Sequence, residues 1–353
     1  MAGNQALGRN LDANAMRNHF YRFPGVDNDK DKTLSAMLRM AVIAQTQERY
    51  EKAPVETDEQ RAEKAALEGL VKQLFVELKR DFKPSDLPPY TLVKLGMHLA
   101  GTSQPEESIS YFDEILDPSE PDPVRKKARI NGMSKYRKNA VFGKAVALGR
   151  SKDNAKVDTA IKMMRDELSK EESSSNPDRK AMEDAQYNLV KFTSARQDWP
   201  AVIAAADKYR ENKTYKKNLP EVLYLQGEAY LKQNELDKAL INFMNITGTY
   251  KGLVKWSAPA VLAQMDTLWK RNTMSQGAGK QPSDRYVAWK AGSQYVQLLD
   301  TPANRKKMTA EDSALVNEVK DKTAKFGSDP AVSQERADIA AYEAAVRAAK
   351  GQK

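Results

Sequence analysis

Residues 220–253 read PEVLYLQGEAYLKQNELDKALINFMNITGTYKGL, and the spacing of four residues in this stretch decides how the rest of the chain is interpreted. Gly227 and Tyr230 lie three residues apart, Ala239 follows nine residues later, and Phe243 four residues after that. Small and aromatic residues at fixed separations are what one unit of a repeated structure would show. We therefore searched the chain for a second copy of this spacing.

A second stretch, residues 89–122, reads PYTLVKLGMHLAGTSQPEESISYFDEILDPSEPD and shows the same spacing. Gly96 and Ser108 are its small residues, and their separation of twelve equals that between Gly227 and Ala239. Leu99 and Phe112 take the places of Tyr230 and Phe243. Two stretches with one spacing support a repeat far better than either stretch alone.

Both stretches resemble the tetratricopeptide repeat, a unit of 34 residues that forms two helices. The resemblance makes Gly96, Leu99, Ser108 and Phe112, and likewise Gly227, Tyr230, Ala239 and Phe243, the packing residues between paired helices. Residues 220–253 depart from the usual pattern at three positions. Leu223 stands where Trp is usual, Gln226 where Leu is usual, and Gly252 where Pro is usual. A third, degenerate unit covers residues 183–219, with Leu189 in the first helix and Trp199 before the second.

Three further stretches have helical periodicity without matching the repeat pattern. Their predicted inward faces are Leu34, Met37, Leu38, Ala41 and Ala44, then Ala66, Leu67, Leu70, Leu74 and Leu78, then Val157, Ala160, Ile161, Met164 and Leu168. We therefore expect an all-α fold, a right-handed α-solenoid of about fourteen helices arranged as tetratricopeptide-like hairpins. The solenoid should cover residues 31–275, with a helical cap over residues 276–353. Residues 1–30 should hold the end of an incomplete repeat and a leader.

The composition leaves little material for metal or nucleophile chemistry. The 353 residues include no Cys and only two His, so thiolate metal sites, disulfides and a Cys nucleophile are excluded. His19 and His98 are far apart in the sequence, and we expect each to be a packed or surface side chain. We predict no catalytic, cofactor-binding or metal-binding residues. No apolar run approaches the roughly 20 residues of a membrane-spanning helix.

The segment SQGAGKQPSD at residues 275–284 invites comparison with a phosphate-binding loop. That loop needs a Gly where Met274 stands, a hydroxyl residue where Gln281 stands, and a strand before it. We therefore interpret the segment as a flexible loop. The paired carboxylates Glu171 and Glu172 lie in a polar linker and are interpreted as solvated.

Charge is concentrated in residues 123–150, PVRKKARINGMSKYRKNAVFGKAVALGR, which we call the basic segment. It holds nine Lys or Arg and no acidic residue, whereas the whole chain has 57 basic and 48 acidic residues, so the rest of the chain balances. We expect the segment to fill the next first-helix position, where helices line the concave face in the resembling family. Its candidate partner-binding residues are Arg125, Lys126, Lys127, Arg129, Lys135, Arg137 and Lys138.

Three interpretations of the basic segment stay open: a solvated face, a site for an acidic protein or peptide, and a site for nucleic acid or another polyanion. The density of charge suits phosphate, but single-strand readers usually add stacking aromatics, and only Tyr136 and Phe142 interleave here. The repeat resemblance favours a noncatalytic scaffold that binds a protein or peptide. The alternatives are a basic nucleic-acid adaptor and an unrecognised enzyme on a helical scaffold.

The looseness of the repeats resembles that of bacterial envelope proteins, including those serving outer-membrane assembly and the Tol–Pal system. This resemblance favours the periplasm or cell envelope over the cytoplasm. The first residues, MAGNQALGRNLDANAMRNHF, contain no apolar signal core. Because residues 17–25 read as the end of a repeat, we expect a native leader or a larger N-terminal part to precede residue 1.

Overall fold

The computed structural model describes residues 29–351 apart from 56, 103–104, 278 and 306–307, and within this part every regular element is a helix. It contains sixteen α-helices and two short 3-10 helices, so the prediction of an all-α fold is confirmed. The predicted number of about fourteen was too low, because the basic segment divides into two helices and a four-residue helix, α16 (Pro302–Arg305), was not foreseen. No helix in these residues is both long and apolar enough to cross a bilayer.

The chain forms two compact units, Met1–Asp166 and Glu167–Lys353. The boundary lies inside α9 (Asn154–Glu172), within the stretch for which the sequence predicts one solenoid. The inward face predicted for this helix is confirmed, because Val157, Ala160, Ile161, Met164 and Leu168 are all buried.

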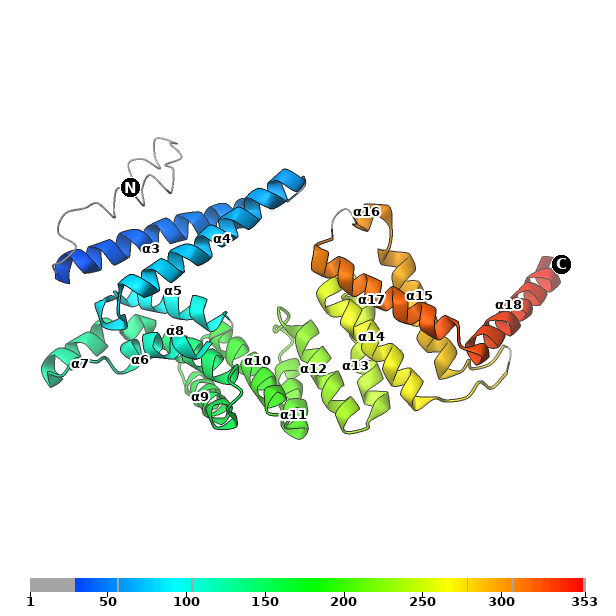
Figure 1. The fold of residues 1–353 in the computed structure, drawn as a ribbon. Coiled ribbons are helices and arrows are strands. Elements are labelled where there is room, and N and C mark those ends of the chain that lie inside the picture. The colour runs from blue at the N-terminus through cyan, green and yellow to red at the C-terminus, as the bar shows by residue number, and fades with distance from the viewer. Residues whose placement is uncertain (1–28, 56, 103–104, 278, 306–307, 352–353) are drawn as a thin grey trace. The chain divides into compact units, whose positions relative to one another are not determined.

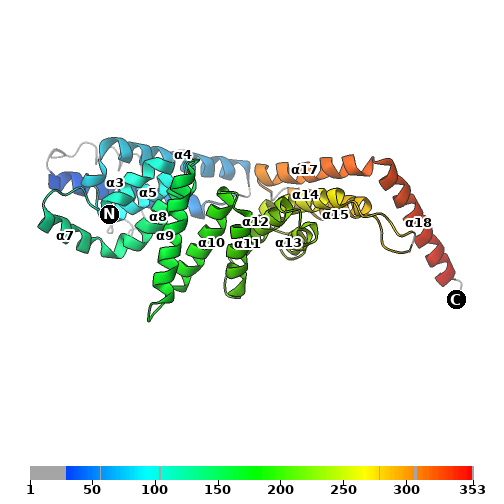
Figure 2. The same ribbon diagram turned by 90° about the horizontal axis from the view of Figure 1, so that it is seen from below.

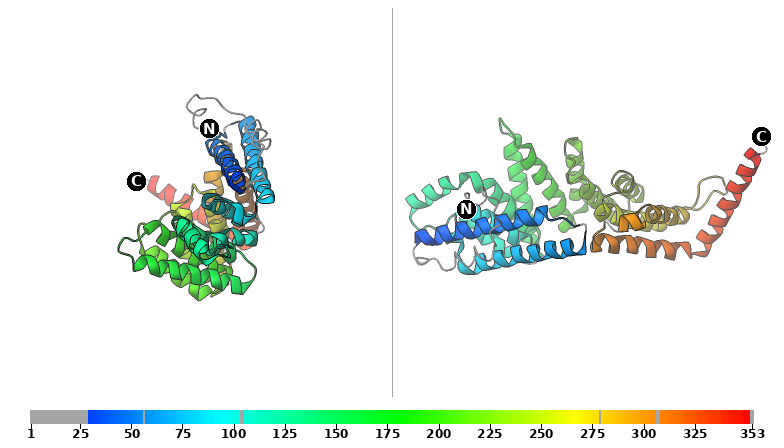
Figure 3. Two further views of the ribbon diagram at one scale, coloured as in Figure 1. Left: turned by 90° about the vertical axis from the view of Figure 1, so that its left-hand side faces the viewer. Right: turned by 90° about the horizontal axis from the view of Figure 1, so that it is seen from above.

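The first described helices of unit 1 are two long ones, α3 (Asp29–Lys52) and α4 (Asp58–Asp81), that lie side by side (Figures 1 and 3). Thr57 and Gln60 form a capping box that starts α4. The predicted inward face of α3 was wrong: Met37 is 54% exposed, whereas the buried residues are Ala36, Met40, Val42, Ile43 and Thr46. The side chain of Leu34 lies outside the described part of the chain. Apolar residues occur on all sides of this part of α3, so the periodicity of the sequence alone did not determine which side would pack against α4.

The stretch 89–122 forms α5 (Pro89–Ala100), the 3-10 helix η2 (Pro105–Ser108) and α6 (Ile109–Leu116). A β-carbon built on Gly96 would lie 2.8 Å from Phe112 Cε1, so α5 and α6 meet at this glycine. Phe112 is fully buried, and Leu99 is 7% exposed. The hydroxyl of Ser108, also buried, donates to the Pro105 carbonyl at 2.6 Å.

Unit 2 continues with helices that each pack on the next, as in a helical repeat (Figures 1 and 2). They are α10 (Arg179–Ala195), α11 (Trp199–Glu211), α12 (Leu219–Lys232), α13 (Leu236–Thr249), α14 (Val254–Arg271), α15 (Asp284–Leu299), α17 (Ala310–Gly327) and α18 (Pro330–Gly351). The helix α17 packs on both α14 and α15, and α18 packs on α15 near its own start. The rest of α18 extends away from α14, α15 and α17 in all the views of Figures 1 and 2.

The stretch 220–253 corresponds to α12 and α13, which meet at Gly227. A β-carbon on Gly227 would lie 2.6 Å from Phe243 Cε1, and both Phe243 and Ala239 are fully buried. Tyr230 is half-buried beneath Lys238, whose Nζ lies 5.3 Å from the ring centroid.

Gln226, where the repeat pattern has Leu, is fully buried and hydrogen-bonded on both sides of its amide. Its Nε2 donates to Asp207 Oδ1 at 2.7 Å, and its Oε1 accepts from Arg210 at 2.7 Å. The departure from the pattern therefore creates a polar contact between α11 and α12 in place of an apolar one.

Candidate functional site

The basic segment folds as two helices, not as the single helical position that the sequence predicts. The first, α7, covers Pro123–Gly132, and the second, α8, covers Ser134–Gly149. Met133 lies between them with its side chain buried in the core of unit 1. The buried side chain of Met133 fixes the backbone between α7 and α8, and the basic segment is divided into two helices there. Lys127 and Lys138 therefore lie on different helices.

Two cations of α7 bind acidic residues at the C-terminal end of α6. Arg129 lies 3.0 Å from Glu114, whose side chain is only 3% exposed, and also donates to the Ser85 carbonyl at 3.0 Å. Lys126 lies 2.5 Å from Asp117. A buried carboxylate needs a paired cation or hydrogen-bond donors, so Arg129 is a structural residue.

Three cations of α8 and its C-terminal end also have interaction partners. Lys144 lies 2.6 Å from Asp113, and the guanidinium of Arg150 donates to the Ala100 carbonyl at 2.6 Å. Lys138 is half-buried and has an interaction partner as well. Five of the nine cations in the basic segment thus interact with other groups of the same chain.

Four candidate residues remain exposed, and we call Arg125, Lys127, Lys135 and Arg137 the free cations. Within the described part of the chain, none of the four makes an ion pair. Lys135 Nζ lies 4.9 Å from the centroid of the neighbouring Tyr136 ring. The sequence-predicted set of seven therefore separates into four free cations and three that contact other residues.

The outer face of α7 combines charge with an exposed apolar residue. Val124 is 79% exposed, and Ala128, one turn further on, is exposed too. Arg125 and Lys127 flank this short apolar strip on its two sides, because residues one position away lie about 100° around a helix. The inner face carries Lys126, Arg129 and Ile130, which are partly buried.

Burial contributes little to holding α7, since none of its side chains is buried. Isolated helices shorter than about 12–15 residues are marginal in water, and α7 has ten. Its stabilising contacts are the Asp122 N-cap, which accepts from Arg125 N at 2.8 Å, and the two ion pairs to α6. The helix lies at the outer edge of unit 1 in Figures 1 and 2. Ion pairs thus position a helix whose other side faces solvent.

The two aromatics of the segment are not placed for stacking with bases. Tyr136 is half-buried and packs against the core of unit 1, and Phe142 is also partly buried. No exposed aromatic side chain therefore interleaves with the free cations within the described residues of the basic segment.

The described residues hold no cluster of histidine and carboxylate side chains that could bind a metal ion. His98 stacks on Phe75 with ring centroids 4.0 Å apart, and burial together with the charge of Lys72 lowers its pKa. His19 lies outside the described residues. Among those that are described, no three His, Asp or Glu side chains converge as metal ligands would.

Backbone hydrogen bonds cross the glycine-containing loop after α14, for which the sequence predicts flexibility. Asp284 N donates to the Thr273 carbonyl at 3.0 Å, and Gln276 N to the Gln281 carbonyl at 2.9 Å, so the two sides of the loop are joined. The element before the loop is the helix α14, and not the strand that precedes a phosphate-binding loop.

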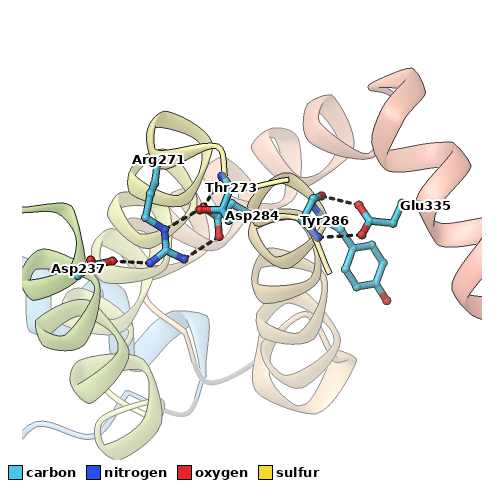
Figure 4. A network of polar contacts seen from close by, with 7 residues as sticks. Asp237, Arg271, Thr273, Asp284, Tyr286 and Glu335 are labelled. Carbon is cyan, nitrogen blue, oxygen red and sulfur yellow. Dashed lines mark hydrogen bonds and ion pairs between the residues drawn. The ribbon is translucent and has the colours of Figure 1, made fainter. Parts of the chain in front are cut away.

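An ion-pair network closes the base of this loop (Figure 4). Arg271 donates to both carboxylate oxygens of Asp284, at 2.8 and 2.7 Å, and to Asp237 on α13 at 2.5 Å. Burial raises the pKa of Asp284, but hydrogen bonds from Arg271 and Thr273 hold it below its ordinary value. On the other side, Glu335 of α18 accepts from the backbone N–H of Ser283 at 2.8 Å and from its hydroxyl. The network joins α13, α14, α15 and α18.

Sequence reasoning names Glu114 among the acidic residues that could neutralise the basic segment, but it did not find that Glu114 is buried, or that Val124 is exposed. Glu114 lies in a predicted repeat helix, where a charged residue is expected to face solvent. Its burial depends on the position of α7, which the sequence pattern does not give. Val124 follows Pro123 at a helix start, where the pattern does not show which side will be covered. Comparison of the sequence with protein-family models and with curated proteins finds no match.

Proposed function

We propose that this chain is a noncatalytic interaction scaffold, a right-handed solenoid of tetratricopeptide-like hairpins, that binds an acidic protein or peptide through α7 and the start of α8. The observation that carries the proposal is the separation of the basic segment into structural and free cations. Folding accounts for Lys126, Arg129 and Lys144, which contact acidic residues of unit 1. It does not account for the four free cations.

Charge and apolar surface together favour a protein partner. Arg125 and Lys127 flank Val124 and Ala128 on α7, so a partner with carboxylates beside an apolar side chain would bind both kinds of group. Exposed cations would steer such a partner over a distance of about 10 Å, the screening length at moderate salt. An apolar contact adds binding that salt does not screen.

Nucleic acid is the second candidate, supported by the density of positive charge on one short segment. Phosphate contacts alone supply nonspecific binding that falls steeply with salt. The partly buried positions of Tyr136 and Phe142 leave this candidate without the stacking surface that single-strand binders use. The enzyme alternative has no cluster of catalytic groups in the described residues to support it.

The test compares two fourfold variants of the same charge. The first replaces the free cations: Arg125→Gln, Lys127→Gln, Lys135→Gln and Arg137→Gln. The control replaces exposed cations elsewhere: Lys162→Gln, Arg165→Gln, Arg179→Gln and Lys216→Gln. Binding is measured by fluorescence anisotropy with a labelled peptide of alternating leucine and glutamate, and with a labelled single-stranded DNA.

We expect the first variant to bind the acidic peptide about tenfold more weakly, which corresponds to about 1.4 kcal/mol, and the control variant to bind it like the native protein. Both variants should melt within a few degrees of the native protein, because neither removes an ion pair between residues that the structure describes. Equal binding by all three proteins contradicts the site. Binding of the DNA in preference to the peptide, lost in the first variant, supports the nucleic-acid candidate instead.

A further inference from the structure

A cleft of about 480 Å³ lies in unit 2 between α15, α17 and the start of α18. This volume falls within the range of small-molecule sites in proteins, about 300–1,000 Å³. The helices α15 and α17 run antiparallel beside the cleft: Gly292 lies against Thr323, whereas Asp300, further along α15, accepts from Lys320, which comes earlier on α17. The two helices form the walls of the cleft, and α18 contributes one side chain, Arg336, at one end.

Short side chains line the middle of the cleft. They are Ser293 and Val296 on α15, and Thr323 and Ala324 on α17. Longer side chains lie at the two ends, with Trp289 at the end near α18 and Lys320 at the other. The short side chains leave the space, and Val296 and Ala324 give its walls apolar surface.

Hydrogen-bond donors converge at the end near α18. The Arg336 guanidinium lies over the Trp289 ring, 4.1 Å from its centre. Such stacking occupies the flat face of a guanidinium and leaves the N–H groups at its edge free to donate. A β-carbon built on Gly327 would lie 2.9 Å from Trp289 Nε1 and 3.7 Å from Arg336 Nη1. The indole N–H and the guanidinium are therefore close enough to donate to one ligand group.

These donors have no acceptor among the described residues. Arg336 makes no ion pair or hydrogen bond there, and the indole N–H of Trp289 makes no hydrogen bond. The last carbonyl groups of α17, which lie nearby, already accept from Ser328, Asp329 and Ser333. The tryptophan and arginine donors are therefore available to a ligand.

The charged side chains that line the cleft are both cations. Arg336 lies at one end and Lys320 at the other, and none of the described lining residues is acidic. Lys320 shares Asp300 with Arg305, so one carboxylate pairs with two cations. The lining therefore favours a negatively charged ligand.

Two acids near Arg336 in the sequence are engaged away from the cleft. Asp329 lies 3.5 Å from Arg285. Glu335 accepts from the backbone N–H and the hydroxyl of Ser283, the N-cap of α15, where the helix dipole favours negative charge. Neither acid lines the cleft, so neither takes the position of an anion beside Arg336.

We infer that this cleft binds a small organic anion, with its carboxylate or phosphate group at Arg336 and Trp289 Nε1 and its apolar part against Val296 and Ala324. A guanidinium suits such a group because it can donate two parallel hydrogen bonds to carboxylate or phosphate oxygens. The cleft shares no residue with the basic segment, so the inference goes beyond the function proposed above and does not depend on it.

The experiment uses the indole N–H groups of the intact chain as reporters. The protein has four Trp, and the Trp289 signal in the ¹H–¹⁵N NMR spectrum is assigned with the variant Trp289→Phe. The probes are benzoate and phenyl phosphate, which carry the two anionic groups on the same apolar ring. Benzyl alcohol is the neutral control, and inorganic phosphate lacks the apolar part. Trp199 and Trp256, outside the lining, serve as internal controls.

We expect benzoate, phenyl phosphate or both to shift the Trp289 indole signal in a saturable manner, with the Trp199 and Trp256 signals unchanged. The tighter of the two probes identifies the anionic group. Benzyl alcohol should cause no shift, and inorganic phosphate should bind more weakly than phenyl phosphate. Arg336→Gln should weaken binding about tenfold, and Arg336→Lys by less, because lysine keeps the charge without the paired hydrogen bonds.

Two further variants separate the cleft from the stability of α18. Ala324→Leu fills the middle of the cleft from an exposed position without changing Arg336, and should also weaken binding about tenfold. Lys325→Gln removes an exposed cation of α17 outside the lining and should bind like the native protein. The fourfold variant of the free cations should also respond like the native protein, which distinguishes this site from that on α7.

Three results would overturn the inference. The first is an unchanged Trp289 signal at about 10 mM of both anionic probes, well above the Kd of about 1 mM that a weak ligand would show. The second is native binding by both Arg336→Gln and Ala324→Leu, since the anion would then contact the indole without using the cleft. The third is equal binding of inorganic phosphate and phenyl phosphate, which would leave no role for the apolar walls.

Discussion

Gly227 and Phe243 are in direct contact across the seam of α12 and α13, at a distance that leaves no space for a side chain on residue 227. A β-carbon there would lie 2.6 Å from Phe243 Cε1, 3.0 Å from Cζ and 3.1 Å from Cδ1. Gly96 and Phe112 make the same contact between α5 and α6. In each unit, helices approach closely where a glycine lies opposite a buried ring.

The first prediction concerns this contact directly. Gly227→Leu should destabilise unit 2 by about 1–3 kcal/mol, because the buried Phe243 ring has to move to admit the new side chain. At about 2–4 °C per kcal/mol for a unit of this size, thermal unfolding followed by circular dichroism should show a clearly lower melting temperature. An unchanged melting temperature would mean that α12 and α13 do not pair at Gly227.

The second prediction compares two Gly→Ala changes in helices of unit 1. Gly69 lies in the middle of α4 with nothing within 4 Å of a built β-carbon, whereas a β-carbon on Gly143 in α8 would lie 2.2 Å from Phe112 Cζ. Gly69→Ala should stabilise the unit by about 0.5–1 kcal/mol through helix propensity. Gly143→Ala should destabilise it despite the same gain in propensity. Urea unfolding of the two variants tests the opposite signs, and the same sign for both would contradict the packing of α8 on α6.

The third prediction concerns the network at the base of the loop. Arg271→Gln should destabilise unit 2 by about 1–3 kcal/mol, because it leaves the buried carboxylate of Asp284 without its bidentate partner. The double variant Arg271→Gln with Asp284→Asn should recover part of this loss, since no charge is then left buried. Chemical denaturation of both variants measures the difference. If the double variant is no more stable than Arg271→Gln, Asp284 is not the residue that needs the arginine.

The fourth prediction concerns pH. Hydrogen bonds from Arg305 and Lys320 lower the pKa of Asp300 to about 2 from an ordinary value of 3.8. A lowered carboxyl pKa stabilises the folded state at any pH above the unfolded value, and this contribution is lost as the pH falls toward the folded value. Asp300→Asn should therefore be less stable than the native protein at neutral pH, and the difference should shrink below about pH 4.

Denaturation curves of the two proteins at about pH 7, pH 4 and pH 3 measure that convergence. Asp329→Asn is a suitable comparison, because Asp329 lies 3.5 Å from Arg285, a looser ion pair in the same unit. A difference between native and Asp300→Asn proteins that stays constant across this range would show that Asp300 stabilises the fold by packing and not by charge.

Helical class and the close-packing glycines could be read from the sequence because they depend on local spacing. The separation of twelve between the small residues recurs in two stretches, and the inward face of α9 follows its periodicity from Val157 to Leu168 without exception. The same reasoning was wrong for α3, whose apolar residues are not confined to one side. There the buried face, with Met40 and Ile43, is chosen by the helices packed around it.

The sequence by itself determined that the positive charge of this protein is concentrated in residues 123–150, and that these residues are helical in character. Only the tertiary structure decided which of those charges are available. Arg129 is engaged because the buried carboxylate of Glu114 lies across from it on another helix, while Arg125, four residues earlier and one turn away, faces solvent. Charge is a property of each residue, but pairing depends on which residues the fold brings within a few ångströms, and partners such as Arg150 and Ala100 are 50 residues apart in the chain.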